Sequence, residues 1–155
     1  MAKLSEGSLA PEFALPSHDG QTVTSESLKG AIAVIFFYPK DDTPGCTTEA
    51  KDFTTLGAAF AKAGAKLFGV SRDSVASHCK FVEKHELGIT LLSDAEGVMC
   101  EAYGVWVEKS MYGKNYMGIE RTTVIIDAQG TIARIWPKVS VKDHAAEVLA
   151  AVQTL

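Results

Sequence analysis

Cys46 is the residue of this sequence best placed to do chemistry, because a helix is predicted to begin just before it. Thr43 is of a type that often precedes the first helical residue, and Pro44 suits the first helical position. Cys46 would then lie in the first turn, where free backbone N–H groups and the helix dipole favour an anion. The thiolate is an anion and is the nucleophilic form of cysteine. The pattern predicts a reactive sulfur, with a small buried apolar side chain as the alternative.

The other two cysteines, Cys79 and Cys100, do not form a recognisable pair with Cys46. An odd count of cysteines, without an export signal in MAKLSEGSLAPEF, argues against a disulfide framework. The absence of a CxxC spacing argues against a zinc ribbon and a thioredoxin-type dithiol. We therefore expect free thiols in the cytoplasm. On the predicted helices, Cys79 and Cys100 would both fit buried apolar positions.

Length and composition indicate a single domain over residues 1–155. Apolar residues make up 46% and charged residues 22%, which is ordinary for a globular protein. A net charge of -4, with no basic run, argues against nucleic acid as a partner. No apolar run has the length of a membrane span. His78, Cys79 and His85 lack further ligands for a tetrahedral metal site, so neither a metal nor another cofactor is expected.

Strands alternate with helices along the chain, and a hairpin and a last helix close it. This order predicts an α/β domain with a mixed central sheet, helices on both sides and an N-terminal β-hairpin. The apolar run 31–38 is typical of a central strand buried on both faces. The other expected strands are a hairpin over 13–24, single strands over 66–70 and 89–92, and a hairpin of 122–126 and 131–136, with a long irregular segment over 105–118. The expected helices run from 44 to Gly64, over 74–86, from Asp94 and from Ser140. The side chains expected to be buried on the last three helices are Val75, Cys79 and Val82, then Val98, Ala102 and Tyr103, then Val141, Ala145, Val148 and Val152. His18 and His144 are expected at the surface.

Several motifs resemble those of a known family. The segment from Pro39 to Cys46 resembles the PxxxTxxC motif of peroxiredoxins, and GIERTTVIID, with Arg121, looks like the strand that carries their arginine. FYPKDDTPGCTTEA, YGVW and MYGK together resemble the bacterioferritin comigratory protein, or peroxiredoxin Q, subfamily. The resemblance extends from about Gly7 to the final helix. It implies a thioredoxin-like fold, a monomer and thiol-dependent reduction of peroxides.

The resemblance also implies a role for each motif residue. The Cys46 thiolate would attack a peroxide and become a sulfenic acid. The Thr43 hydroxyl would hydrogen-bond the thiolate and the peroxide, or act as the N-cap alone. Arg121 would stabilise the thiolate and the charge on the breaking O–O bond, or be a solvated arginine at a strand end. Pro39 would shelter the sulfur, or only end a strand. Glu49 would orient Arg121, or lie on a solvated helix face.

The sequence departs from the subfamily at the second cysteine. Many members carry one five positions after the first, where this chain has Lys51. Some relatives use a cysteine on the following helix, and Cys79 lies there, although Val82 is closer to the expected place. Either Cys79 forms a disulfide with Cys46 that a thioredoxin-like protein reduces, or an external thiol acts directly on the sulfenic acid.

Two functions remain open from the sequence. The first is a thioredoxin-dependent peroxidase that acts on hydrogen peroxide and organic hydroperoxides. The second is a redox sensor or binding module on the same scaffold, which would pass oxidation to a partner without fast turnover. The same Cys46 environment would serve both, so peroxide turnover in the presence of a thiol donor separates them.

Overall fold

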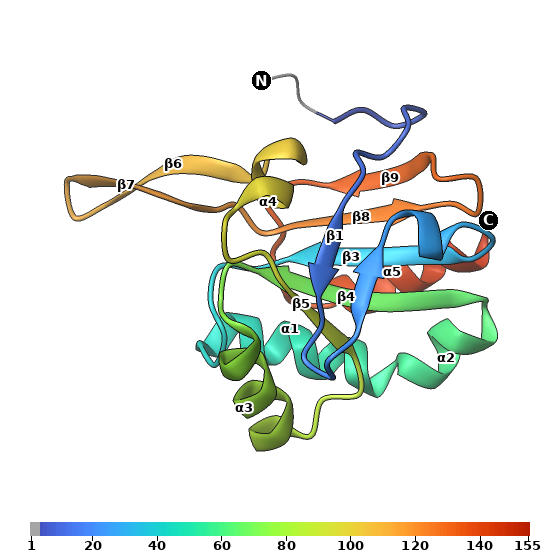
Figure 1. Ribbon diagram of the computed structural model, residues 1–155, viewed down its shortest axis with the longest axis horizontal. Helices are drawn as coiled ribbons and strands as arrows, with labels where there is room; N and C mark the ends of the chain where they lie inside the picture. The colour runs from blue at the N-terminus through green and yellow to red at the C-terminus, as the bar shows by residue number, and fades with distance from the viewer. Residues whose placement is uncertain (1–3) are drawn as a thin grey trace.

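A five-stranded mixed sheet forms the centre of the protein, which is described here as a computed structural model over residues 4–155 (Figure 1). The strands lie in the order β5 (Thr90–Ser93), β4 (Ala65–Ser71), β3 (Ile32–Phe37), β8 (Thr122–Ile126) and β9 (Ile132–Trp136). β3 pairs in parallel with β4 and antiparallel with β8. Ala33 to Phe37 are all buried, which confirms the predicted central strand.

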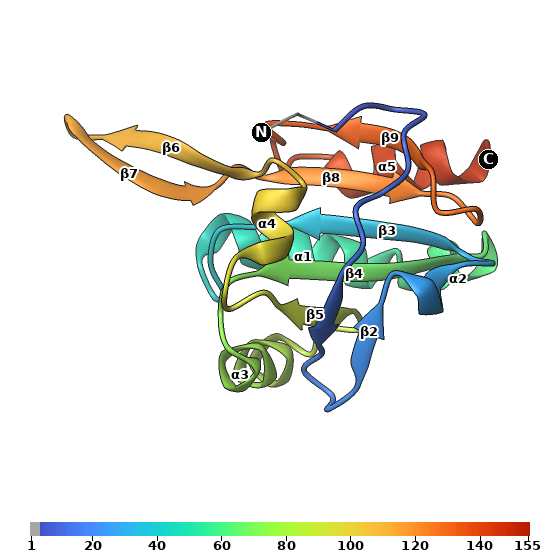
Figure 2. The same ribbon diagram turned by 45° about the horizontal axis from the view of Figure 1, so that its top comes forward.

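Two layers cover the sheet (Figures 1 and 2). On one face α1 (Pro44–Thr55), α2 (Gly57–Lys62) and α5 (His144–Gln153) enclose a core in which Phe36 stacks on Phe53 with ring centroids 4.7 Å apart. On the other face lie β1 (Ala14–Pro16), β2 (Thr22–Thr24), the short helix η1 (Glu26–Leu28) and α4 (Val98–Ala102). The α/β class, the mixed sheet and the N-terminal hairpin of β1 and β2 are as predicted.

The helix predicted from 44 to Gly64 is two helices. Leu56 has φ -91° and ψ 5°, so the backbone leaves helical geometry there, and α2 begins at Gly57. Glycine has a low helix propensity, which weakens a helix at this point. Gly64 does end the second helix, with φ 82°.

The segment predicted to be irregular is a hairpin of β6 (Trp106–Met111) and β7 (Lys114–Ile119), which extends away from the sheet (Figure 2). Tyr112 and Gly113 form its two-residue turn, with φ 53° and 77°. Positive φ at both positions is typical of a type I′ turn, usually formed by Asn-Gly. Tyrosine at the first position concealed this turn from the sequence pattern.

The buried stripe of α3 (Val75–His85) also differs from the prediction. His78 and Phe81 are buried, whereas Cys79 is exposed, because polar partners around His78 hold that side of the helix inward. The helix ends at His85, with a left-handed Glu86 as its C-cap, within one residue of the predicted end. The alternative of a buried apolar Cys79 is therefore wrong.

The last two helices begin later than predicted. Val98, at the start of α4, is 66% exposed, and Met99 and Cys100 face inward in its place. The Asp94 carboxylate accepts the backbone N–H groups of both Met99 and Cys100, so it supports the start of α4 as expected, although the N-cap is Gly97. The last helix, α5, begins at His144, and not at Ser140.

His144 is buried and is not a surface residue, since its Nε2 lies 2.8 Å from Thr123 Oγ1. His18 is half-buried, and its Nδ1 accepts the backbone N–H of Leu91. None of the helices in residues 4–155 is both long and apolar enough to span a membrane.

Candidate active site

The site forms where the β3–α1 loop (residues 38–43) leaves the sheet. Phe37, the last residue of β3, pairs with Thr122, the first residue of β8. The residue before β8 is Arg121, so the antiparallel register brings Arg121 to the edge from which the loop departs. Cys46 follows in the first turn of α1. Sequence positions 46 and 121 meet because of this pairing.

The local start of α1 matches the prediction. Thr43 is the N-cap residue, with extended backbone angles, and Pro44 is the first helical residue. The Thr43 carbonyl accepts a hydrogen bond from the Thr47 N–H at 2.8 Å. The Thr43 hydroxyl does not cap the helix; it donates to the Lys40 carbonyl at 2.8 Å and so closes the loop on itself. Cys46 is 1% exposed, so its sulfur lies in a nearly closed setting at a helix N-terminus.

The guanidinium of Arg121 binds two partners at once. Its Nη2 donates to Cys46 Sγ at 3.3 Å, and its Nη1 donates to Glu49 Oε1 at 2.7 Å. A Cβ on Gly45 would lie 3.2 Å from Nη2, so the glycine leaves room for the guanidinium. Positive charge beside the sulfur stabilises the thiolate. Arg121 and Glu49 are therefore not solvated side chains, which was the alternative for each of them.

Glu49 is a buried carboxylate whose charge is only partly compensated. Burial raises the pKa of Glu49 to about 7, although the Arg121 guanidinium acts to lower it. Its Oε1 is ion-paired with Arg121, while Oε2 is buried without a hydrogen-bond partner in the described chain. Glu49 therefore orients the guanidinium from inside the protein.

Pro39 is exposed and lines a hollow of about 470 Å³ between the loop and the β6–β7 hairpin. Trp106 and Lys109 of β6 line it as well, and Arg72 lies 4.4 Å from the Trp106 ring centroid. Burial and the nearby charge of Arg121 lower the pKa of Lys109. Sequence reasoning missed Lys109 near Arg121 and Trp106 in the hollow, because the hairpin that carries them was not foreseen.

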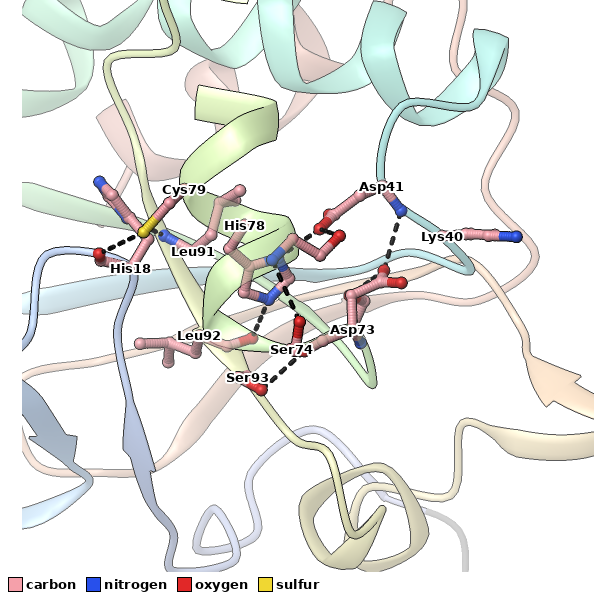
Figure 3. Close-up of polar contacts among 12 residues, drawn as sticks. His18, Lys40, Asp41, Asp73, Ser74, His78, Cys79, Leu91, Leu92 and Ser93 are labelled. Carbon is pink, nitrogen blue, oxygen red and sulfur yellow. Dashed lines mark hydrogen bonds and ion pairs between the residues drawn. The ribbon is translucent and has the colours of Figure 1, made fainter. Parts of the chain in front are cut away.

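The other two thiols differ from Cys46 in their surroundings. Cys79 is exposed, and its Sγ donates to the His18 carbonyl at 3.0 Å. Figure 3 shows the Cys79 sulfur directed towards His18 and away from the contacts of His78 with Asp41. Cys100 is buried, and burial together with Asp94 raises the pKa of its thiol well above the usual range. The buried apolar setting expected for Cys100 is thus confirmed.

The three residues considered for a metal have separate partners. His78 faces Asp41, Cys79 faces the His18 carbonyl, and His85 Nε2 lies 2.7 Å from Asp42 Oδ1. Within residues 4–155 no group of three or more His, Cys, Asp or Glu side chains is placed to hold a metal ion.

Comparison with known proteins shows the family to which the chain belongs. The model of the AhpC/TSA family matches residues 7–135. Peroxiredoxin Bcp of Bacillus subtilis is 50% identical over 143 residues, which are 92% of this chain and 91% of the relative. Peroxiredoxin Bcp of Escherichia coli is 40% identical over 149 residues, which are 96% of each chain.

Solved structures agree with these relatives. Peroxiredoxin Q of Xanthomonas campestris superimposes with a TM-score of 0.88 at 46% identity, covering 92% of this chain and 90% of that one. A cysteine-to-serine mutant of PrxQ from Xylella fastidiosa superimposes with a TM-score of 0.94 at 34% identity, covering 99% of this chain and 98% of that one. The chain belongs to the AhpC/TSA family and, within it, to the Bcp/PrxQ peroxiredoxins. Its fold is thioredoxin-like, and it is a peroxidase.

Proposed function

We propose that this peroxiredoxin reduces hydrogen peroxide and organic hydroperoxides through a sulfenic acid at Cys46. The Cys46 thiolate attacks the terminal peroxide oxygen, an S–O bond forms, and the O–O bond breaks. The leaving oxygen takes up a proton and departs as water or an alcohol. The observation that carries this proposal is the 3.3 Å contact between Arg121 Nη2 and Cys46 Sγ.

Each neighbouring residue has a part in this step. Arg121 stabilises the thiolate and then the charge that develops on the peroxide oxygens, because its guanidinium is held in place before the reaction begins. Thr43 lies at the start of α1, where its hydroxyl oxygen can accept a hydrogen bond from the peroxide. To donate to the sulfur, the hydroxyl must turn away from the Lys40 carbonyl. Pro39 limits access to the sulfur from the side of the hollow.

The hollow supports organic hydroperoxides as substrates. Trp106, Tyr116 and Met117 give it an apolar and aromatic side, against which an alkyl group would pack. Among the relatives, a Xanthomonas campestris bacterioferritin comigratory protein is described as having alkyl peroxide reduction activity.

Recycling of the enzyme requires a second thiol. We propose that Cys79 attacks the sulfenic sulfur, which forms a disulfide and releases water, and that thioredoxin then reduces this disulfide. Cys46 is buried and Cys79 faces the turn between β1 and β2, so the two segments must move before the sulfurs meet. If they do not meet, an external small thiol reduces the sulfenic acid directly.

Three serine variants test this proposal in a thioredoxin-coupled assay with cumene hydroperoxide. Cys46→Ser should abolish turnover, and Cys100→Ser, which removes a buried thiol away from the reaction, should retain it. Cys79→Ser should lose thioredoxin-dependent turnover if the disulfide route holds. Wild-type oxidation of Cys46 without steady-state turnover, with either thioredoxin or a small thiol, would favour the sensor and overturn the peroxidase proposal.

Mass spectrometry of the intact protein separates the two recycling routes. After one equivalent of peroxide, loss of two hydrogens is expected, with Cys46 and Cys79 joined. A stable oxygen adduct on Cys46, with Cys79 free, would contradict the disulfide route. The resemblance also implies a monomer, which the elution volume in gel filtration tests, and the cytoplasm remains the location that the sequence predicts.

A further inference from the structure

The β3–α1 loop is attached to α3 by a buried carboxylate. Asp41 side-chain atoms are 3% exposed, and they accept hydrogen bonds from Tyr38 Oη at 2.6 Å and Ser77 Oγ at 2.7 Å. His78 Nδ1 lies 2.7 Å from Asp41 Oδ2 (Figure 3). The backbone N–H of Asp41 also donates to Asp73 Oδ2 at 2.8 Å. Both the main chain and the side chain of Asp41 are thus tied to α3 and the residues just before it.

The partners of His78 indicate its protonation. Its Nε2 lies 2.9 Å from the Leu92 carbonyl oxygen, which only accepts, so Nε2 carries a proton. Tyr38 and Ser77 each donate a hydroxyl hydrogen to the Asp41 carboxyl group, and one proton joins His78 Nδ1 to Asp41 Oδ2, which lie 2.7 Å apart. Burial and Asp41 raise the pKa of Tyr38, which keeps that hydroxyl a donor. His78 and Asp41 therefore form a buried, directly hydrogen-bonded pair.

Other polar groups near His78 come from three elements. The Tyr38 hydroxyl lies 3.5 Å from His78 Nδ1, and the Asp73 carboxylate is held by Ser71 Oγ and the Asp41 N–H. Leu92 of β5 contributes only its carbonyl. Each ring nitrogen of His78 thus has a buried partner, Asp41 for Nδ1 and the Leu92 carbonyl for Nε2.

The exposed carboxylate of Asp42 ties the same loop to the far end of α3 through two contacts. His85 Nε2 lies 2.7 Å from Asp42 Oδ1. Asp42 Oδ2 accepts Lys84 Nζ at 2.7 Å, with side-chain exposures of 42% and 63%. Exposed ion pairs contribute little to stability, whereas removal of one member of a buried pair leaves an uncompensated charge. The buried contact is the one able to hold the loop.

We propose that the His78–Asp41 pair is a clasp that holds the β3–α1 loop, and with it Thr43 and Cys46, in the arrangement that reacts with peroxide. His78 is then a positioning residue on a helix that does not carry the reacting sulfur. This inference rests on the proposed peroxide reaction of Cys46. Small displacements of a reacting group can reduce a rate by about 100-fold.

Two substitutions of His78 separate the clasp from a general role in folding. The Asn side-chain amide in His78→Asn can take the place of Nδ1 and donate to Asp41, but it loses the bond to Leu92. The longer amide in His78→Gln can take the place of Nε2 and keep the bond to Leu92, but it loses Asp41. Asp41→Asn replaces the carboxyl group by an amide of the same shape. Lys84→Ala is a control that breaks only the exposed contact between Lys84 and Asp42.

Two measurements are made on each variant and on the wild type. The first is backbone hydrogen–deuterium exchange of residues 38–46, compared with β3 and β8. The second is the rate constant for oxidation of Cys46 by cumene hydroperoxide in stopped-flow fluorescence. His78→Gln and Asp41→Asn should expose the loop to exchange, with the strands still protected, and slow oxidation about 10- to 100-fold. His78→Asn should recover most of the wild-type rate, and Lys84→Ala should resemble the wild type.

The clasp is wrong if His78→Gln and His78→Asn slow oxidation equally, or if neither changes exchange in the loop. If the His78 variants fail to fold, Asp41→Asn decides by the same two measurements, because only the β3–α1 loop is altered. Wild-type protein whose Cys46 does not react with peroxide would overturn the proposed function, and loop exchange would still support or contradict the clasp.

Discussion

Arg121 and Cys46 are 75 positions apart in the sequence, yet Arg121 Nη2 donates to Cys46 Sγ across 3.3 Å. The pairing of Phe37 with Thr122 sets this distance, since it places the residue before β8 beside the loop that leaves β3. Glu49 fixes the other end of the guanidinium at 2.7 Å. The central sheet therefore positions the Cys46 sulfur beside a guanidinium whose other end is already held.

The first prediction concerns the shape of the Arg121 cation. Arg121→Lys keeps the charge, but an ammonium is a point charge and cannot span Cys46 and Glu49 as the planar guanidinium does. We expect the rate constant for Cys46 oxidation to fall by about 100-fold, as for loss of one preorganised donor. Stopped-flow fluorescence measures it. The control is Arg134→Lys, an arginine that lies over Trp136 on β9. Equal rates in the two variants would contradict this role.

Local sequence patterns predicted the elements that depend on neighbouring residues. The apolar run 31–38 indicated the central strand, and Thr43 followed by Pro44 located the start of α1 before Cys46. Arg121 was found only through the family motif, because no local signal shows which strand pairs with β3. The Arg121–Glu49 contact depends on that pairing as well, so the sequence left the setting of Glu49 open.

Two features of the structure, the buried face of α3 and the β6–β7 hairpin, were not predicted from the sequence pattern. Helical periodicity favoured Cys79 as the buried residue of α3, but Asp41 lies 37 positions from His78 and draws that histidine inward. The β6–β7 hairpin was missed because Tyr112 is an unusual residue for a left-handed turn position. In both cases a polar or backbone preference outweighed hydrophobic spacing.

The second prediction concerns Gly69 of β4, against which side chains of the neighbouring strands β5 and β3 pack closely. A Cβ on Gly69 of β4 would lie 2.8 Å from Leu91 Cδ2 and 2.9 Å from Phe36 Cζ, both in the buried core. Gly69→Ala should lower the free energy of unfolding by about 1–3 kcal/mol, because a filled core must shift to accept the methyl group. Urea denaturation measures this change.

The matched control for Gly69 is Gly57 at the start of α2. A Cβ there meets no atom within 4 Å, and alanine favours helix. Gly57→Ala should therefore raise the free energy of unfolding by about 0.5–1 kcal/mol. A neutral effect of Gly69→Ala would show that the β4 core has room that the distances exclude.

The third prediction is a pH dependence of stability that comes from Glu49. Burial raises the pKa of Glu49 to about 7 from 4.5, so the folded protein binds a proton more tightly than the unfolded chain. This contribution to stability is fully present below pH 4.5, falls as the pH rises towards 7, and is lost above that value. Glu49→Gln cannot titrate, and its amide carbonyl can still accept from Arg121.

The free energies of unfolding of the wild type and Glu49→Gln, measured in urea at pH 5, 6, 7 and 8, test this expectation. The difference, wild type minus variant, should decrease from pH 5 to 7 and then become constant. Glu83→Gln, on the exposed face of α3, is the control and should follow the wild type at every pH. If the Glu49→Gln curve ran parallel to the wild type throughout, the Arg121 guanidinium would outweigh burial, and Glu49 would be ionised across this range.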